Sequence, residues 1–310
     1  MKIGQGFSLP EAALDAHSTR GYRRTRSGLY VPGTRRRQRG RPRAADIFAG
    51  CGGFSLGMQQ AGLNVVAAVE WDVDAAQAYL SNLGSVYGCA VAYVDEPDRA
   101  RLAKALKRGK VQEGWVGQHN PDLDGSGCRA FVLGDATKVT GELIRSTLAA
   151  IGEDPTIEVV CGGPPCQGMS TAGRQDPADP RNNLVLEFVR IADELRASVF
   201  CMENVPPLLT AKKFRPLFDS LVARAREAGF DVVANVLDAV NYGVPQYRRR
   251  AFVVGTRGEA KRRPFSFAMP THWSFGATDS KRWSFLHDQG DGHNQPTRGD
   301  TLPLFDGADE

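Results

Sequence analysis

Short apolar runs alternate with stretches of helical periodicity from residue 44 to about residue 256. The apolar runs are short enough for buried strands, and the stretches between them place apolar residues on one helical face. We expect strands near residues 45–49, 65–69, 130–133, 157–161, 198–202, 232–238 and 251–255, and helices near residues 55–61, 73–82, 140–150, 183–195 and 214–228. This alternation predicts an α/β fold with a doubly wound, mostly parallel, Rossmann-like sheet.

Two segments interrupt this alternation, residues 84–129 and residues 257–310. The first holds an expected helix around Arg101 to Arg108 and then a stretch rich in Gly, Asp and Asn, so we interpret it as a surface insertion. The second is polar, with isolated aromatic residues and no clear period. We interpret it as an irregular tail or the start of a short or incomplete second lobe. The main domain is therefore expected over residues 44–256.

Composition and charge add a basic arm to this picture. The chain has 310 residues, of which 42% are hydrophobic, which is enough for one well-packed core. Residues 1–44 hold one lysine and ten arginines against one glutamate and one aspartate, a net charge of +9 that leaves −5 on the remaining chain. Residues 1–43 are therefore interpreted as an arm, which either contacts nucleic-acid phosphates or is a solvated, flexible leader.

The six cysteines show neither C-x-x-C pairing nor histidine partners at metal-ligand spacing. No signal peptide and no long apolar span precedes them. These features predict a chain in the reducing cytoplasm, with no metal site and no membrane association.

A glycine-rich turn follows the first expected strand, with Gly50, Gly52 and Gly53 at its centre. Glycines in such a turn allow the backbone to approach a ligand closely, and the amides of the following helix can face an anionic group. Glu70 ends the second expected strand, where it can accept hydrogen bonds from ribose hydroxyls, and Trp71 beside it offers a stacking face. The turn alone could be only a tight turn, but with the acidic residue it predicts a nucleoside-cofactor site.

A second acidic residue, Asp135, follows the third expected strand within Gly134-Asp135-Ala136. It can accept a hydrogen bond from an adenine amino group, so we assign Asp135 and Ala136 to the same nucleoside site. The competing role for Asp135 is the N-cap of a helix over residues 138–150. A glycine turn with acidic partners fits both nicotinamide cofactors and S-adenosylmethionine.

One cysteine separates these two cofactor classes. Cys166 lies in the loop Gly162-Gly163-Pro164-Pro165-Cys166-Gln167-Gly168, directly after the fourth expected strand. Cys161 and Cys201 lie inside apolar runs and are interpreted as small core residues. Cys166 instead faces whatever fills the site, where backbone amides and nearby arginines can favour its thiolate. We therefore interpret Cys166 as a nucleophile.

Two later motifs supply partners for this nucleophile. Glu203 ends the fifth expected strand, where a partly dry pocket could keep its carboxyl protonated, and Asn204 is expected to orient the proline-cysteine loop through backbone hydrogen bonds. Gln246, Arg248 and Arg250 stand at alternate positions and would share one face of an extended segment. A thiolate, an acid and paired arginines are what addition to a cytosine ring requires, because carbon 5 of cytosine is a poor nucleophile until something adds to carbon 6.

These residues resemble the cytosine carbon-5 DNA methyltransferase family. The motifs appear in family order and cover residues 44 to about 272: D-x-F-A-G-x-G-G at 46–53, E-W-D at 70–72, G-D at 134–135, G-G-P-P-C-Q at 162–167, D-x-R-x-x-L at 179–184, M-E-N-V at 202–205 and Q-x-R-x-R at 246–250.

The resemblance implies S-adenosylmethionine as methyl donor, Cys166 as nucleophile, Glu203 as its acid partner and Arg248 and Arg250 as arginines that build the site. It also implies a cofactor site that includes Phe48 and Pro164 beside Glu70, Trp71 and Asp135, and a sheet of the S-adenosylmethionine-dependent methyltransferase type. Double-stranded DNA is the implied partner, with the target base flipped out of the duplex so that the thiolate can reach carbon 6.

The end of the chain departs from the family pattern, because no target-recognition or closing motif is visible after His272. Three explanations stay open: a second polypeptide that carries these elements, a truncated or degenerate copy, or a divergent tail. Two other functions also stay open, a transfer-RNA cytosine methyltransferase with the same nucleophile and a non-catalytic nucleic-acid-binding homologue. A nicotinamide oxidoreductase is disfavoured because it would use neither Cys166 nor Glu203.

Overall fold

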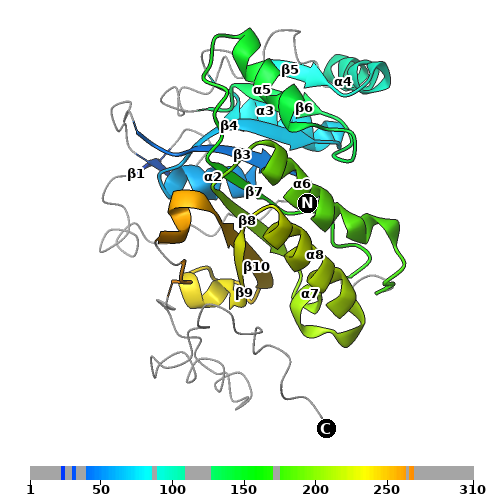
Figure 1. The fold of residues 1–310 in the computed structure, drawn as a ribbon. Helices are drawn as coiled ribbons and strands as arrows, with labels where there is room; N and C mark the ends of the chain where they lie inside the picture. Colours follow the sequence, from blue (N-terminus) through cyan, green and yellow to red (C-terminus); the bar gives the residue numbers. More distant parts are fainter. Residues whose placement is uncertain are drawn as a thin grey trace, which may run out of the picture.

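An eight-stranded sheet forms the centre of the protein (Figure 1). The computed structural model describes residues 22–24, 30–32, 40–85, 89–108, 127–169, 175–262 and 265–268. The strands of the sheet are β3 (Arg43–Ile47), β4 (Asn64–Glu70), β5 (Ala90–Tyr93), β6 (Ala130–Leu133), β7 (Val159–Gly162), β8 (Val199–Asn204), β9 (Asp231–Asp238) and β10 (Arg249–Thr256). A separate antiparallel pair is formed by β1 (Tyr22–Arg24) and β2 (Tyr30–Pro32).

The order of strands in the sheet is β5-β6-β4-β3-β7-β8-β10-β9, and β10 runs opposite to the other seven strands. The chain runs from β3 through β4 to β6 on one side, and then returns to β7 and β8 on the other side of β3. The strand order therefore reverses between β3 and β7, and ligands of doubly wound sheets bind beyond the carboxyl ends of the strands at such a point. The glycine turn follows β3 and the Cys166 loop follows β7, so both meet at this crevice.

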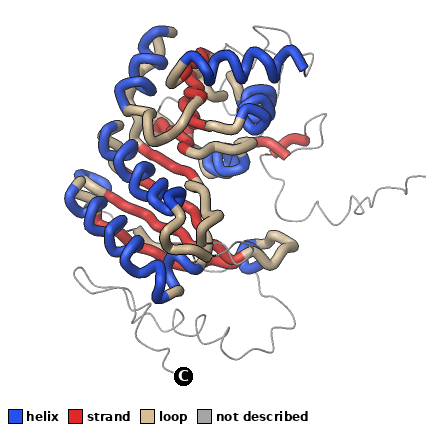
Figure 2. The backbone as a smooth tube through the Cα atoms, turned by 90° about the vertical axis from the view of Figure 1, so that its right-hand side faces the viewer, coloured by secondary structure: helices blue, strands red, loops and turns tan. Residues whose placement is uncertain are grey.

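Helices cover both faces of the sheet (Figure 2). The α-helices are α2 (Gly53–Gln60), α3 (Val73–Leu83), α4 (Glu96–Arg108), α5 (Gly141–Ala150), α6 (Leu184–Glu194), α7 (Pro207–Thr210) and α8 (Arg215–Glu227). Short 3-10 turns lie at Pro180–Asn183, Lys212–Phe214, Ala239–Tyr242 and Gly258–Arg262. One apolar cluster joins the sheet to α5, α6 and α8, and a second cluster joins it to α3 and α4. No helix of the described ranges has the length and apolar character needed to cross a membrane.

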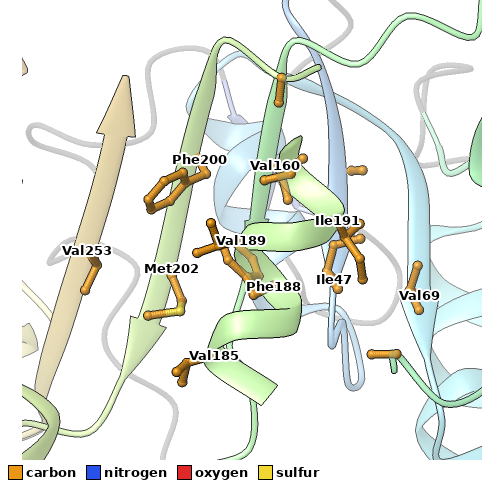
Figure 3. Packing of buried hydrophobic residues seen from close by; sticks show 14 of the residues in the cluster. Ile47, Val69, Val160, Val185, Phe188, Val189, Ile191, Phe200, Met202 and Val253 are labelled. Atoms are coloured by element: carbon orange, nitrogen blue, oxygen red, sulfur yellow. The ribbon is translucent and has the colours of Figure 1, made fainter. Parts of the chain in front are cut away.

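The larger cluster is built by the amphipathic face of α6. Val185, Phe188 and Val189 are fully buried at the i, i+3, i+4 spacing of one helical face. Figure 3 shows them packed over Phe200 and Met202 of β8. The rings of Phe188 and Phe200 meet edge to face, with centroids 6.0 Å apart. This packing holds β8 in place and thereby positions Glu203 at its end.

The structure confirms the doubly wound α/β fold and contains a strand at each of the seven predicted places. It differs within residues 84–129, which we expected to form a surface insertion. Part of that segment forms β5, which pairs in parallel with β6 at the edge of the sheet, and α4, which includes the helix expected around Arg101 to Arg108. The run Ala90–Tyr93 is short and only half-buried, so it lacks the long apolar signal of a central strand.

The predicted domain boundaries stay predictions. Most of the basic arm over residues 1–43 and most of the tail over residues 257–310 lie outside the described residues. The cytoplasmic location also remains a prediction.

Candidate active site

The turn between β3 and α2 leaves open space beside a left-handed backbone. Gly50 and Gly52 have φ angles of +55° and +93°. A Cβ on Gly52 would lie 2.1 Å from Cδ1 of Leu83 and 2.9 Å from Cδ2 of Tyr79, so α2 can approach α3 only with glycine there. A Cβ on Gly50 or Gly53 would meet no described atom within 4 Å. The backbone at Gly50 is therefore open to a ligand.

Phe48 also adopts a left-handed conformation, with a φ angle of +64°. An aromatic residue in this region costs about 1–2 kcal/mol, which the surrounding structure must offset. The Phe48 side chain packs against the larger apolar cluster, and the next amide, that of Ala49, donates to the carbonyl of Val69 over 3.0 Å. The bend at Phe48 thus turns the chain from β3 toward the end of β4.

Glu70 joins the ends of β3 and β4 through its carboxylate. Oε2 accepts a hydrogen bond from the amide of Gly50 at 2.7 Å, and Oε1 accepts from the amides of Trp71 at 2.8 Å and Asp72 at 2.7 Å. A carboxylate offers about four acceptor positions, so about one remains for a ligand hydroxyl. Trp71 is 62% exposed, which leaves its indole ring available for stacking.

The loop after β6 brings Asp135 to the same edge of the sheet. Oδ1 of Asp135 accepts from the amide of Thr137 at 2.9 Å, so the side chain stabilises its own turn. The following helix, α5, is instead capped by Thr140, whose hydroxyl accepts from the amide of Leu143 at 3.1 Å. The N-cap role considered for Asp135 is therefore wrong. The methyl group of Ala136 is buried in the core, so a ligand at this edge could reach only the backbone of that residue.

A buried carboxyl, Asp46, lies on β3 beneath the glycine turn. Its Oδ2 accepts from the hydroxyl of Ser55 at 2.7 Å, and that hydroxyl lies 2.8 Å from the hydroxyl of Tyr79. Its Oδ1 is buried and has no hydrogen-bond partner among the described residues. Burial raises the pKa of Asp46 from 3.8 to about 7, the Ser55 hydrogen bonds oppose this shift, and the nearby charge of Glu70 adds to it. The structure thus favours the protonated carboxyl.

This shift predicts a pH-dependent stability that Asp46→Asn should remove. The pKa of Asp46 is about 7 in the folded state, against a reference value of 3.8. Between these two pH values the folded state keeps a proton that the unfolded chain has lost. The contribution of Asp46 to the free energy of unfolding is therefore fully present below the lower pKa. It is lost as the pH rises to the higher pKa, by on the order of 4 kcal/mol in total. Urea unfolding at several pH values from 4 to 8 should show a flatter profile for Asp46→Asn than for the wild type. Exposed Asp74→Asn is the control, and a profile for Asp46→Asn that matches this control would contradict the prediction.

The loop that carries Cys166 is fastened at both ends. A Cβ on Gly162 would lie 1.8 Å from the carbonyl oxygen of Ile47, so glycine is required where β7 passes β3. The buried Asn204 donates from Nδ2 to the carbonyl oxygen of Pro164 at 3.2 Å. The carbonyl of Cys166 accepts from the amide of Met169 at 2.9 Å, and Met169 is fully buried. The geometry confirms that Asn204 holds the proline-cysteine loop through the backbone.

Glu203 meets the two arginines that were expected to share a face. Nε of Arg250 lies 2.7 Å from Oε1 of Glu203, and Nη2 of Arg248 lies 4.0 Å from the same oxygen. The strand pairing explains this, because β10 runs antiparallel to β8 with Phe252 opposite Glu203. The other carboxylate oxygen of Glu203 would lie 3.2 Å from a Cβ on Gly163, so the acid reaches the Cys166 loop.

The Cys166 loop, the Glu203 carboxyl on the next strand and the glycine turn with Glu70 thus lie at the carboxyl edge of one doubly wound sheet. The family model of C-5 cytosine-specific DNA methylase matches residues 43–97 and 128–288, which include all of these elements. The chain belongs to this family.

Curated relatives support the same family. The chain is 35% identical over 219 residues to the type II methyltransferase M.XorII of Xanthomonas oryzae pv. oryzae, covering 70% of this chain and 41% of that protein. It is 31% identical over 236 residues to the type II methyltransferase M.AquIA of Picosynechococcus sp., covering 73% of this chain and 75% of that protein. The chain thus spans well under half of M.XorII but three quarters of M.AquIA.

A solved structure shares the fold. A DNA modification methyltransferase encoded within a prophage (E. coli) aligns with a TM-score of 0.50 and 25% identity, over 73% of this chain and 49% of that chain. The doubly wound sheet is therefore of the S-adenosylmethionine-dependent methyltransferase type.

The electrostatics of Cys166 differ from our expectation. Burial raises the pKa of the Cys166 thiol, and the charge of Glu203 raises it further, while Arg250 and Arg248 lower it by less. We expected the arginines to favour the thiolate, but their charge is shared with Glu203. Burial also raises the pKa of Glu203, against the lowering effect of Arg250 and Arg248. Burial thus shifts the pKa of both the thiol and the acid upward, against the charges of the two arginines.

Three further residues of the family motifs support the loop that carries Cys166, although our sequence analysis gave them no role. Arg181 lies 2.6 Å from Oδ2 of Asp179 and also donates to the side-chain oxygen of Gln167, directly after Cys166. This pairing lowers the pKa of Asp179 to about 2. These residues belong to the motifs D-x-R-x-x-L and P-C-Q, but the separation of the two motifs in the sequence gives no sign that Arg181 contacts Gln167.

S-adenosylmethionine is the methyl donor of this family, and the residues at the sheet edge fit it. The open backbone at Gly50 and the exposed indole of Trp71 leave room for an adenosine group, and the Glu70 carboxylate retains acceptor capacity between them. The described residues contain no cluster of three or more His, Cys, Asp or Glu that could bind a metal ion.

Proposed function

We propose that the protein is a DNA (cytosine-5-)-methyltransferase that transfers a methyl group from S-adenosylmethionine to carbon 5 of a flipped cytosine through a covalent Cys166 adduct. The observation that carries this proposal is the placement of Glu203. Its carboxyl reaches the Cys166 loop from the next strand and is held by Arg250 at 2.7 Å. The curated relatives named as type II methyltransferases support a role in a restriction-modification or DNA-methylation system.

Each catalytic residue has a defined task under this proposal. The Cys166 thiolate adds to carbon 6 of the cytosine ring, and Glu203 donates a proton to ring nitrogen 3, so that carbon 5 becomes electron-rich. Carbon 5 takes the methyl group and S-adenosylhomocysteine is the leaving group. The nitrogen proton then returns to Glu203, the carbon-5 proton passes to water, and Cys166 leaves carbon 6 as a thiolate. Arg250 holds Glu203, and Arg248, whose Nη2 lies 4.0 Å from the same carboxylate, binds the cytosine carbonyl under this proposal. The cytosine must leave the duplex, because Cys166 cannot reach a stacked base.

The cofactor occupies the other half of the crevice under this proposal. Glu70 accepts from the ribose, Trp71 stacks on the adenine, and Asp135 accepts from the adenine amino group. Phe48, the backbone at Gly50, Gly52 and Gly53, and Pro164 line the rest of the site, and Ala136 contributes backbone only.

The decisive experiment is methyl transfer from labelled S-adenosylmethionine by the purified chain, on mixed-sequence duplex DNA and on transfer RNA. Incorporation into DNA supports the proposal. Incorporation into transfer RNA alone would replace it with the RNA methyltransferase alternative. Cofactor binding without transfer to either substrate, even with a complementing polypeptide, would favour a non-catalytic homologue.

A second polypeptide that reads the target sequence is also part of the proposal. The motifs that resemble the family lie between residues 46 and 250, and none of them is a target-recognition motif. A chain that transfers methyl groups only after a second polypeptide is added would support this arrangement. Sequence-specific transfer by the chain alone would remove the need for a partner.

Glu70→Ala should weaken binding of S-adenosylmethionine about 10- to 100-fold, because a charge-assisted hydrogen bond contributes about 1.5–3 kcal/mol. The substitution also releases the amide of Gly50 from the end of β4. Titration calorimetry measures the affinity, and Glu142→Ala, an exposed glutamate on α5, is the matched control. Equal affinity for the two variants would exclude Glu70 from the cofactor site.

A further inference from the structure

We propose that Arg101 of α4 is a positioning residue for the adenine side of the cofactor site, acting through Trp71. The inference rests on the proposed function, because it assigns a role to a neighbour of the proposed adenine-stacking residue. The family model leaves residues 98–127 unmatched, so Arg101 and its partner Asp98 lie outside the matched ranges. The α4 helix, interpreted from sequence as part of a surface insertion, would thus serve the active site.

Arg101 contacts both the ring and the backbone of Trp71. The guanidinium carbon lies 5.5 Å from the centroid of the indole, within the range of a cation–π interaction. Nη2 of Arg101 also donates to the carbonyl oxygen of Trp71 at 3.4 Å. Trp71 nevertheless remains 62% exposed, so Arg101 covers one part of the indole and leaves a stacking surface open.

Asp98 fixes Arg101 from the other side and ties it to a second cofactor loop. Its Oδ1 forms an ion pair with Arg101, and its side chain is only 8% exposed. Its Oδ2 would lie 3.0 Å from a Cβ on Gly134, so the carboxylate packs against the loop that carries Asp135. One buried carboxylate therefore connects the residue behind Trp71 with the loop after β6.

A second contact fastens the beginning of α4 to the same loop. Nζ of Lys138 lies 3.2 Å from Oδ2 of Asp95, and Oδ1 of Asp95 accepts from the amide of Asp98 at 3.2 Å. The amide of Val94 donates to the carbonyl of Leu133 at 3.1 Å. The segment before Arg101 is thus anchored to the end of β6, while Arg101 itself reaches the end of β4.

These contacts restrict the conformation of the Trp71 indole before a ligand binds. An exposed tryptophan side chain loses rotamer freedom when a ligand stacks on it, and this loss opposes binding. A guanidinium held by Asp98 restricts the indole in advance and faces the ring with positive charge. Arg101 is therefore expected to strengthen binding of any ligand that stacks an adenine on Trp71.

Calorimetric titration of the full chain with S-adenosylhomocysteine tests this role. Arg101→Ala should weaken binding about three- to tenfold, as expected for loss of a cation–π contact and its ordering effect. Arg99→Ala is the matched control, because Arg99 is an exposed arginine two positions earlier on α4 and its removal changes the net charge equally. Thermal unfolding of both variants shows whether they fold alike.

A double-mutant cycle separates positioning from a general effect on the fold. In a Trp71→Ala background, Arg101→Ala should have little further effect, because its route to the ligand has been removed. Equal losses in both backgrounds would assign Arg101 a structural role unrelated to Trp71. Unchanged or tighter binding by Arg101→Ala would also overturn the inference, the latter by placing Arg101 on the surface that adenine needs.

The proposed function can fail independently of this inference. If neither the wild type nor Glu70→Ala binds S-adenosylhomocysteine, the cofactor assignment itself fails. If the wild type binds and Glu70→Ala does not, while Arg101→Ala equals Arg99→Ala, only the role of Arg101 is wrong.

Discussion

Replacement of Cys166 by serine should reduce methyl transfer to duplex DNA by at least about a thousandfold, because it removes the group that adds to carbon 6. A serine hydroxyl is a much weaker nucleophile than a thiolate unless a base activates it. Glu203 cannot serve as that base while it donates its proton to the cytosine ring. The substitution leaves the glycine turn and Glu70 in place on β3 and β4, so we expect S-adenosylhomocysteine to bind within about twofold of the wild-type affinity.

The control for this variant is Cys89→Ser. Cys89 is half-buried like Cys166. It lies before the edge strand β5, whereas Cys166 follows β7 in the interior of the sheet. Retained transfer by Cys89→Ser together with loss in Cys166→Ser would tie the activity to one sulfur. Retained transfer by Cys166→Ser, with cofactor still bound, would remove the proposed nucleophile and with it the covalent mechanism.

The fold could be predicted where the local signal was strong. Buried parallel strands such as β4 and β6 are continuous apolar runs, and such runs are visible in one sequence. The edge strand β5 was missed because its four residues form a short, half-buried run instead of a long apolar one. Its identity as a strand depends on pairing with β6, about 40 residues later, which is a tertiary fact.

In the site too, features with a local sequence pattern could be predicted and features set by tertiary contacts could not. Arg248 and Arg250 could be placed on one face because strand periodicity is two, and the structure brings both toward Glu203. The contact between Arg101 and Trp71 spans 30 residues with no periodic pattern, so no spacing rule predicts it. The pKa of Cys166 was also beyond reach, because its direction depends on whether burial or arginine charge dominates. To decide between the two effects, the distances from the thiol to the charged groups must be known, and the sequence does not give them.

Glu203→Gln should separate the two roles that the structure gives this carboxyl. As a proton donor to the cytosine ring, Glu203 is expected to contribute about 100-fold or more to the rate of methyl transfer, and the amide cannot replace it. As a charge, Glu203 raises the pKa of Cys166, so its neutralisation should lower that pKa, with Arg250 and Arg248 left to favour the thiolate. We therefore expect Glu203→Gln to lose methyl transfer while its Cys166 becomes more reactive.

The second effect is measured without DNA, as the rate of Cys166 alkylation by iodoacetamide at about pH 8, well above the ordinary pKa of a glutamate carboxyl. Glu187→Gln is the matched control, because Glu187 pairs with Arg190 at 2.6 Å and its side chain is 24% exposed, against 22% for Glu203. Faster alkylation of Glu203→Gln than of this control, combined with lost transfer, requires Glu203 to act on the substrate and not only on the thiol. Slower alkylation would mean that Glu203 activates Cys166 as a base, and would contradict its role as the proton donor to the cytosine ring.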